Sequence, residues 1–293
     1  MKRSALGVMV AWLVLSPLNA AYAACDPAAA NNVTATCTGV TVNQNGLNGY
    51  GTGGETNLNV TVVSGASVTG TLGGIAISSG TIINFGTVGT IGGAGNFGVL
   101  INSSGNVINF GTITGGAQGV TGGTFNVANS GTITGFAQGI FALGTLNVSN
   151  SGTITGFGSG ISTATTASVT NSGTISGFLA IEFVGGADTL TLLPGSKIIG
   201  AINLGGGGDT VNFRGGNHNL TFDTLAGATV TGTTPFVVSG NQAVAIDPTP
   251  FAVNGRLVGD FSRSVSQVVP NFGNQPSLPA GCRNSVPPAT RCG

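Results

Sequence analysis

Residues that could do acid–base chemistry are few, and they gather late in the chain. Charged residues make up 5% of the 293 residues, where about 25% is usual. Enzymes that cleave polysaccharides on a β-helix need carboxylates or basic groups converging on one face. The candidates for that role are Glu182, Asp188, Lys197, Asp209, Arg214 and Asp223. The pair Asp209 and Arg214 is expected to be a solvated ion pair, so we predict no catalytic residue and keep a polysaccharide-active enzyme as an alternative.

The other common chemistries find little support in the sequence. His218 is the only histidine and so the only candidate base for a catalytic serine, which gives a Ser–His arrangement little support. A calcium-binding nonapeptide requires G-G-x-G-x-D, and the run from Gly205 to Asp209 is one residue too short. The glycine runs do not stand between a strand and a helix, as a phosphate-binding loop would. We predict no metal and no cofactor, with Asp188 and Asp209 at aligned corner turns.

Residues 1–23 have the pattern of an export signal. Lys2 and Arg3 precede an apolar run, and Ala21 and Ala23 supply small residues at the expected cleavage point. Export permits disulfides. Cys25 and Cys37 are therefore predicted to form one, because a metal site would need tighter spacing and a histidine partner. The sequence supports no prediction for Cys282 and Cys292.

The middle of the chain repeats with a period of about 21 residues. The heptapeptide from Asn129 to Gly135 recurs at Asn150 and, with one Thr replaced by Ser, at Asn171. A fixed period of this length indicates one structural unit that is stacked many times. The asparagine column comprises Asn84, Asn109, Asn129, Asn150 and Asn171.

Aliphatic residues keep a fixed place relative to each asparagine. The first column, two residues before it, comprises Ile82, Val107, Val127, Val148 and Val169. The second, four residues after it, comprises Val88, Ile113, Ile133, Ile154 and Ile175. The third comprises Val99, Val120, Ile140, Ile161 and Ile181. Three β-prone stretches per repeat, separated by Gly, Ser and Asn, predict one triangular coil of a parallel β-helix.

The pleat of a strand assigns the residues of each coil to the inside or the outside. In Thr132-Ile133-Thr134 it sends Ile133 to one face and both threonines to the other. With the isoleucines inside, the asparagines are predicted to form an amide ladder at one corner. Phe136, Phe157 and Phe178 form a further column, for which stacking inside and a stripe outside both remain open. The outward threonine pairs would make a flat hydroxyl array, so an ice-binding solenoid is a second alternative.

The repeat predicts the domain organisation. Residues 24–240 are expected to form the β-helix, with room for roughly nine coils between residues 40 and 238. Residues 241–270 are expected to contain a short α-helix, because Pro248 and Pro250 follow the potential cap Asp247 and a helical apolar pattern comes next. Residues 271–293 are proline-rich and read as a disordered tail.

Three segments resemble the passenger region of bacterial autotransporters, the self-exporting proteins of type V secretion. They are the N-S-G-T-I-T-G coils, the segment Pro194–Gly200 followed by Gly205–Asp209, and Val237–Val269. Within the last, Ala245–Phe251 and Gly259–Arg263 are similar to the linker of that family. The resemblance covers roughly residues 25 to 269, and its linker motif is more specific than its repeat.

The resemblance implies a right-handed β-helix, exposed at the cell surface and commonly used in adhesion. It also implies an outer-membrane β-barrel translocator of about 12 strands. Residues 271–293 are too few to form one, so we expect a truncated or frameshifted gene or a translocator on a separate chain. With a translocator the protein would reach the cell surface, and without one it would stop in the periplasm.

The expected function is structural contact without catalysis. The partners implied are glycans or matrix of a host or a neighbouring cell. Nucleic acid is not expected, because the net charge is zero and the stretch from Thr56 to Ile181 has no charged residue and no histidine.

Overall fold

The computed structural model describes residues 24–91, 96–249 and 263, in two compact units, Met1–Ile246 and Asp247–Gly293. The signal sequence of residues 1–23 and the tail of residues 271–293 lie outside the described residues. So does nearly all of the helix expected within residues 241–270.

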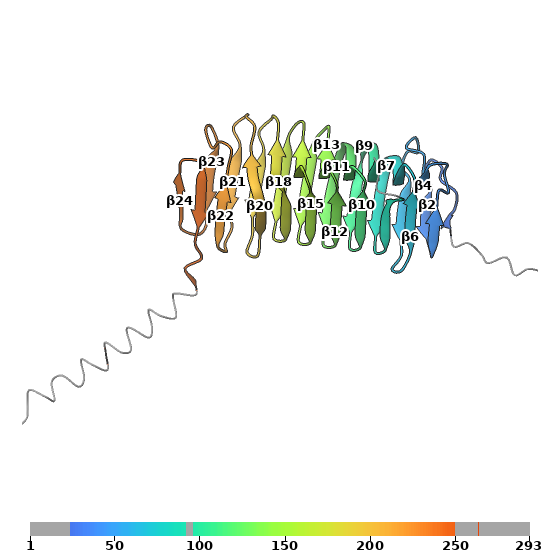
Figure 1. The fold of residues 1–293 in the computed structure, drawn as a ribbon, viewed down its shortest axis with the longest axis horizontal. Coiled ribbons are helices and arrows are strands. Elements are labelled where there is room, and N and C mark those ends of the chain that lie inside the picture. Colours follow the sequence, from blue (N-terminus) through green and yellow to red (C-terminus); the bar gives the residue numbers. More distant parts are fainter. Residues whose placement is uncertain (1–23, 92–95, 250–262, 264–293) are drawn as a thin grey trace, which may run out of the picture. The chain divides into compact units, whose positions relative to one another are not determined.

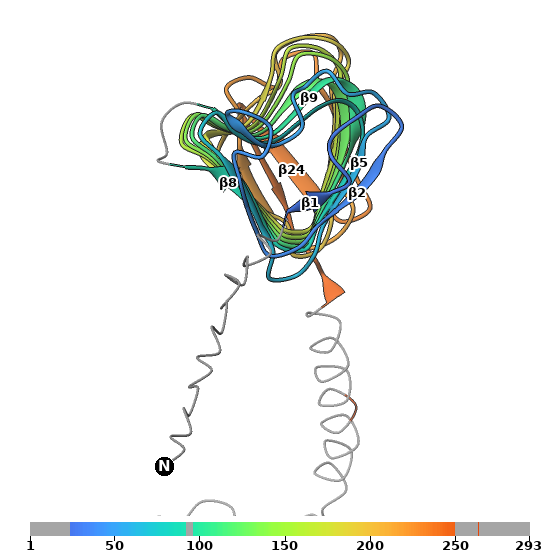
Figure 2. The same cartoon turned by 90° about the vertical axis from the view of Figure 1, so that its right-hand side faces the viewer.

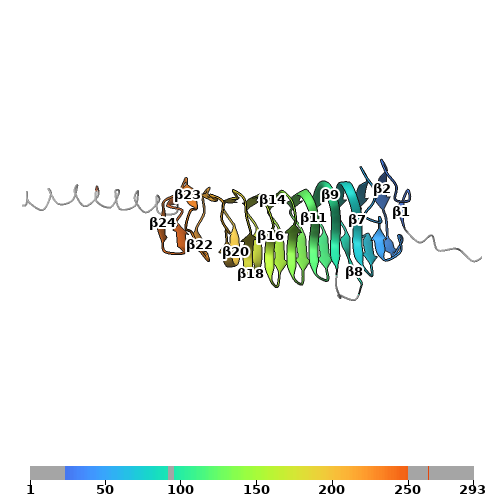
Figure 3. The same ribbon diagram turned by 90° about the horizontal axis from the view of Figure 1, so that it is seen from above.

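The unit Met1–Ile246 is a β-solenoid of about nine turns (Figures 1 and 3). One sheet network of 22 strands winds through it, and its strands pair in parallel except β1 with β2. The repeat is therefore confirmed as a parallel β-helix. Figure 2 views the unit along the stack, where the coils superpose on a roughly triangular outline.

Each coil up to β20 contributes one strand segment to each of three faces, and the later strands β21 and β23 extend only one of them, the groove face. The groove face comprises β2 (Thr34–Cys37), β5 (Asn59–Val62), the ends of β7 (Gly73–Asn84), β9 (Phe97–Asn109) and β11 (Gln118–Asn129), then β14 (Leu146–Asn150), β17 (Ala167–Asn171), β19 (Thr189–Leu192), β21 (Thr210–Phe213) and β23 (Thr229–Gly232). The threonine face comprises β3 (Val40–Val42), β6 (Ser67–Gly70), β8 (Thr87–Thr90), β10 (Thr112–Gly115), β12 (Thr132–Gly135), β15 (Thr153–Gly156) and the starts of β18 (Thr174–Phe183) and β20 (Lys197–Asn203). The third face comprises β4 (Asn48–Tyr50), the starts of β7, β9 and β11, β13 (Gln138–Ala142), β16 (Ser159–Thr163) and the ends of β18 and β20.

The core consists of the three predicted aliphatic columns. Ile133 pairs in register with Ile113 and Ile154 across the threonine face, and none of these side chains is exposed. The corresponding residues of the other two columns are buried as well. Every coil therefore stacks its apolar side chains on those of the next coil, about 4.8 Å away. Burial of these columns is the main favourable contribution to stability, because the stretch from Thr56 to Ile181 has no charged residues that could form ion pairs.

Glycine makes the tight corners possible. In β7 the chain turns from the third face to the groove face at Gly80, whose φ is 140°. A Cβ there would lie 2.0 Å from the carbonyl oxygen of Leu58 in the preceding coil. Only a residue without a side chain fits so close an approach.

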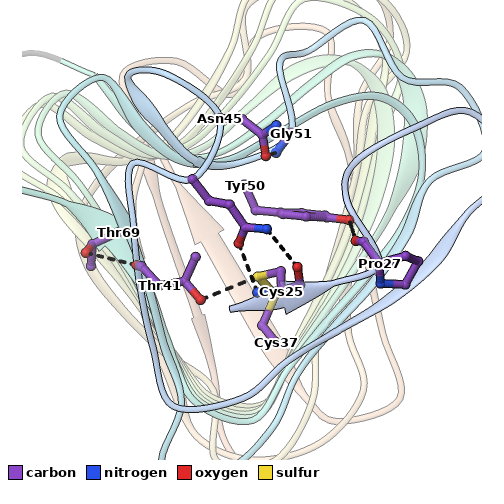
Figure 4. The surroundings of a disulfide bond; sticks show 9 residues. Cys25, Pro27, Cys37, Thr41, Asn45, Tyr50, Gly51 and Thr69 are labelled. Atoms are coloured by element: carbon purple, nitrogen blue, oxygen red, sulfur yellow. Dashed lines mark hydrogen bonds between the residues drawn. A yellow bond between two sulfur atoms is a disulfide. The ribbon is translucent and has the colours of Figure 1, made fainter. Parts of the chain in front are cut away.

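The N-terminal end of the stack is closed by β1 (Cys25–Asp26), which pairs antiparallel with β2 (Figure 4). Cys25 and Cys37 form a disulfide bond there, as the sequence suggests. Gln44 donates from Nε2 to the carbonyl of Cys25 at 2.7 Å and accepts the N–H of Cys25 at 2.9 Å. The buried Tyr50 donates its hydroxyl to the carbonyl of Pro27 at 2.6 Å. These bonds hold the first coil closed.

The C-terminal end is closed by a small antiparallel sheet. It consists of β22 (His218–Thr221), β25 (Gln242–Ala245) and β24 (Phe236–Ser239), in that order. The β structure thus reaches Ala245, inside the range assigned to the linker. Just beyond it, Oδ1 of Asp247 accepts the N–H of Thr249 at 2.9 Å, as a helix cap does. Among the described residues, no helix has the length and apolar character needed to cross a membrane.

Candidate functional site

The five repeated asparagines form a buried ladder at the corner between the groove face and the threonine face. Each Nδ2 donates to the Oδ1 of the next asparagine, from Asn84 to Asn171, at 2.7 to 2.8 Å. The ladder ends where Asn171 donates to the hydroxyl of Ser196. None of the five side chains is more than 2% exposed. They have no access to a ligand, so this ladder stabilises the corner and is not a binding site.

A second asparagine column lies on the outside of the groove face. Asn126 donates from Nδ2 to Oδ1 of Asn106 at 2.8 Å, and Asn147 donates to Oδ1 of Asn126 at 2.9 Å. All three side chains are exposed. Sequence reasoning missed this column, although its members stand three residues before the ladder asparagines. The same 20- and 21-residue spacing was the signal that could have revealed it.

The exposed asparagines line a shallow groove. One depression of about 510 Å³ is lined by Asn106, Val107, Ile108, Asn126, Val127, Ala128, Asn147, Val148, Ser149, Ser168 and Thr170. A neighbouring depression of about 450 Å³ is lined by Asn57, Asn59, Ser79, Gly80, Thr81, Ser104, Gly105, Asn106, Thr124, Phe125 and Asn126. The two share Asn106 and Asn126. We call their combined surface the asparagine groove, and none of its lining side chains is charged.

The threonine face presents a regular array of hydroxyl groups. Thr112 pairs with Thr132 and Thr132 with Thr153, while Thr134 pairs with Thr155. These side chains alternate with the buried isoleucines and point outward. One hydrogen bond within the array joins the hydroxyls of Thr155 and Ser176, at 2.9 Å.

The phenylalanine column lies on the outside, which answers the question that the sequence left open. Phe136, Phe157 and Phe178 are 71%, 77% and 82% exposed, at the corner that follows the threonine face. The rings of Phe136 and Phe157 are stacked with centroids 5.7 Å apart. A depression of about 670 Å³ is lined by Phe157, Phe178 and their neighbours. The corner therefore carries an exposed aromatic stripe beside the hydroxyl array.

Asp188 and Asp209 are buried on adjacent coils. Oδ1 of Asp209 accepts the N–H of Asp188 at 2.9 Å, and Oδ1 of Asp188 accepts the N–H of Ala167. The expected solvated pair of Asp209 with Arg214 is thus wrong, because Asp209 is only 4% exposed and binds backbone instead. The pKa of Asp188 is raised to about 6, mainly by burial. The hydrogen bond from the N–H of Ala167 lowers this pKa, and the negative charge of Asp209 raises it further. Oδ2 of Asp188 has no hydrogen-bond partner.

The remaining charged candidates do not join this pair. Glu182 lies on the third face, where the hydroxyl of Ser159 donates to it at 2.6 Å. Lys197 lies exposed on the threonine face. His218 is buried, stacks on Phe213 and contacts the carbonyl of Gly215 at 2.7 Å. Within residues 24–91 and 96–249, no cluster of three or more acidic, histidine or cysteine residues could hold a metal ion.

Glu55 is held by its own loop. Its carboxylate accepts the N–H and the hydroxyl of Thr52 and the N–H of Gly53. Burial alone would raise the pKa of Glu55, but the hydrogen bonds from Thr52 and Gly53 outweigh it and keep the pKa below its usual value. The carboxylate of Glu55 is engaged in these hydrogen bonds within its loop, so we assign it a structural role.

No protein-family model, curated protein or solved structure matches this chain. The candidate sites are therefore judged by their own geometry, and the asparagine groove and the threonine face are both uncharged surfaces that extend over several coils.

Proposed function

We propose that the chain is an exported, non-catalytic surface protein of the autotransporter passenger type, which makes contact with cells or matrix through its uncharged solenoid. The observation that carries the proposal is the outward surface of the coils. From Thr56 to Ile181 the solenoid has no charged side chain, and its outer faces carry repeated amides and hydroxyls on a scaffold of stacked parallel strands.

Such a surface works by repetition. A single hydrogen bond contributes only about 0.5–1.5 kcal/mol net, but the same groups recur in each coil. Once one coil is engaged, the neighbouring coils meet the partner at high effective concentration. Because the coils are held by ladders and core columns, little conformational entropy is lost on binding. Contact would therefore build up along the stack without a deep pocket.

The signal pattern of residues 1–23 and the linker-like segment that begins near Ala245 support export by the type V route. The proposed partner for that step is an outer-membrane translocator. With it, the solenoid would stand on the cell surface, and a coil that has emerged would template the next one.

Cell binding tests the contact proposal. Bacteria that display the chain through an outer-membrane translocator should adhere to one another or to host cells more than bacteria with the translocator alone. Flow cytometry and sedimentation of the cultures measure this. Equal adhesion of the two strains, with display verified by antibody, would contradict the proposal.

Ice binding is the second candidate, and one observation favours it. The threonine pairs of β10, β12 and β15 stand in register on consecutive parallel strands and form a regular hydroxyl array. Thermal hysteresis of the full chain decides the matter. Thermal hysteresis that is present in the parent and lost in Thr134→Arg would favour ice binding over the contact proposal. Absence of thermal hysteresis in the parent would exclude ice binding.

A further inference from the structure

We infer that the asparagine groove is a binding site for a neutral oligosaccharide that lies along the axis of the coils. This inference rests on the proposed contact function, to which it adds the face that is used and the chemical class of the ligand.

The groove is continuous over several coils. Its two depressions, of about 510 and 450 Å³, meet at Asn106 and Asn126. Apart from Asn57, which precedes β5, the lining residues come from β5, β7, β9, β11, β14 and β17, which are successive strands of one face. A ligand in it would cross coils that rise about 4.8 Å each, similar to the length of one sugar unit in an extended chain. The shape therefore suits a linear oligomer.

The amides leave a regular set of hydrogen-bonding groups free. Asn126 uses one N–H toward Asn106 and one oxygen lone pair toward Asn147. An amide has two N–H donors and two acceptor positions, so one donor and one acceptor of Asn126 remain. Sugar hydroxyls both donate and accept, and they match such alternating groups. Beside the amides, Ile108 and Ala128 supply apolar surface for the C–H faces of a sugar ring.

Charge decides between neutral and anionic ligands. Polyanions bind proteins by neutralisation with Lys and Arg. The lining of the groove has neither, and the nearest segments of sequence, from Thr56 to Ile181, contain none. A sulfated or uronic acid polymer would lose its hydration here without gaining a cation. The neutral class is therefore favoured.

A peptide is a poorer match for the same groove. Extended peptides gain affinity by pairing their backbone with the free edge of a sheet. On this face, β11 is paired on both sides, with β9 and β14, and β14 is paired with β11 and β17. No backbone edge is open within the groove. A peptide would have to bind through side chains alone.

The test is binding of the full chain to defined probes. Linear oligomers of glucose, mannose, galactose and N-acetylglucosamine would be measured by calorimetry, beside heparin, polygalacturonate and a random peptide library. We expect at least one neutral oligomer to bind, with affinity rising with oligomer length and nearly independent of salt. Binding only of a polyanion or of peptides, or of none of the probes, would overturn the inference.

Two variants locate the site. Ala128→Arg places a long side chain in the groove and leaves the amide column intact, and Asn126→Ala removes the central amide. Each should weaken binding about tenfold or more, equivalent to about 1.4 kcal/mol. Thr134→Arg, the matched control on the threonine face, should bind as the parent does. Circular dichroism checks that all three are folded. Equal affinity of parent and Ala128→Arg would overturn the assignment to this groove.

The same variants separate this inference from the contact function. If Ala128→Arg abolishes both oligosaccharide binding and cell adhesion, the groove is the contact face. If no neutral oligomer binds the parent chain but the parent and Ala128→Arg both support adhesion, the groove is overturned and the contact function stands. Oligosaccharide binding without any adhesion would support the groove and contradict the contact function.

Discussion

At the scale of single residues, identical asparagines have different roles according to the face of the strand on which they lie. Asn129 is 2% exposed and links Asn109 to Asn150 in the buried ladder. Asn126, three residues earlier on the same strand, is exposed. Loss of the buried amide of Asn129 is costly, because its hydrogen-bond partners are buried and cannot bind water in its place.

Asn129→Ala is expected to destabilise the fold by about 1–3 kcal/mol, since Oδ1 of Asn150 loses its donor inside the corner. Asn126→Ala, its control, should change the stability by about 0.5 kcal/mol or less, as exposed substitutions usually do. Urea unfolding followed by circular dichroism measures both. Equal midpoints for the two variants would show that losing a buried ladder asparagine costs no more stability than losing an exposed one.

Asp188 gives stability a specific pH dependence. Its pKa is raised from 3.8 to about 6 in the folded state, mainly by burial. Between these pH values the folded chain keeps a proton that the unfolded chain has lost, so the contribution of Asp188 to stability falls as the pH rises from about 4 to 6. Above pH 6 the folded chain carries the full free-energy cost of the buried, ionised carboxylate of Asp188.

Asp188→Asn should remove this dependence. We expect the variant to match the parent near pH 4 and to exceed it by about 1–3 kcal/mol at pH 7. Unfolding midpoints between pH 4 and 8 measure the difference, with the exposed Asp223→Asn as control. If the stability difference between Asp188→Asn and the parent does not change with pH, the account of Asp188 is wrong.

At the scale of elements, sequence periodicity predicts which side chains of a strand point into the core, because the pleat of the strand sets their direction. Ile133 and its column could be placed inside because alternate residues of a strand point to opposite sides. Phe136 could not, because it stands at a corner, where alternation is interrupted and the direction of the side chain depends on the turn. Burial of Asp209 was also missed, since isolated aspartates are mostly exposed and only the stacked N–H groups of the neighbouring coil explain it.

The corner at Gly80 yields a prediction about one element, β7. Gly80→Ala is expected to destabilise the solenoid by more than about 2 kcal/mol, because the new Cβ would strike the backbone of Leu58 and the positive φ would strain the residue. Gly185→Ala serves as the control, since a Cβ there meets nothing within 4 Å. Thermal unfolding compares them. Similar melting temperatures would mean that the corner relaxes easily.

At the scale of the whole molecule, each coil of the unit Met1–Ile246 packs on its two neighbours and on little else. The pairing of β12 with β10 and β15 is an example. Stability in such a stack is approximately a sum of coil terms and nearest-neighbour terms. Damage to one coil should therefore spread over a limited distance. A globular core would instead respond as a single unit.

Ile133→Ala tests this at the centre of the stack. The fully buried side chain leaves a cavity that should cost about 2–5 kcal/mol. Amide hydrogen exchange is expected to show lost protection in β10, β12 and β15, while β5 and β21 stay close to the parent. Thr132→Ala, its outward neighbour, should leave the whole pattern unchanged. Equal loss of protection from β5 to β21 would mean that the solenoid unfolds as one cooperative unit, which would contradict the nearest-neighbour account of its stability.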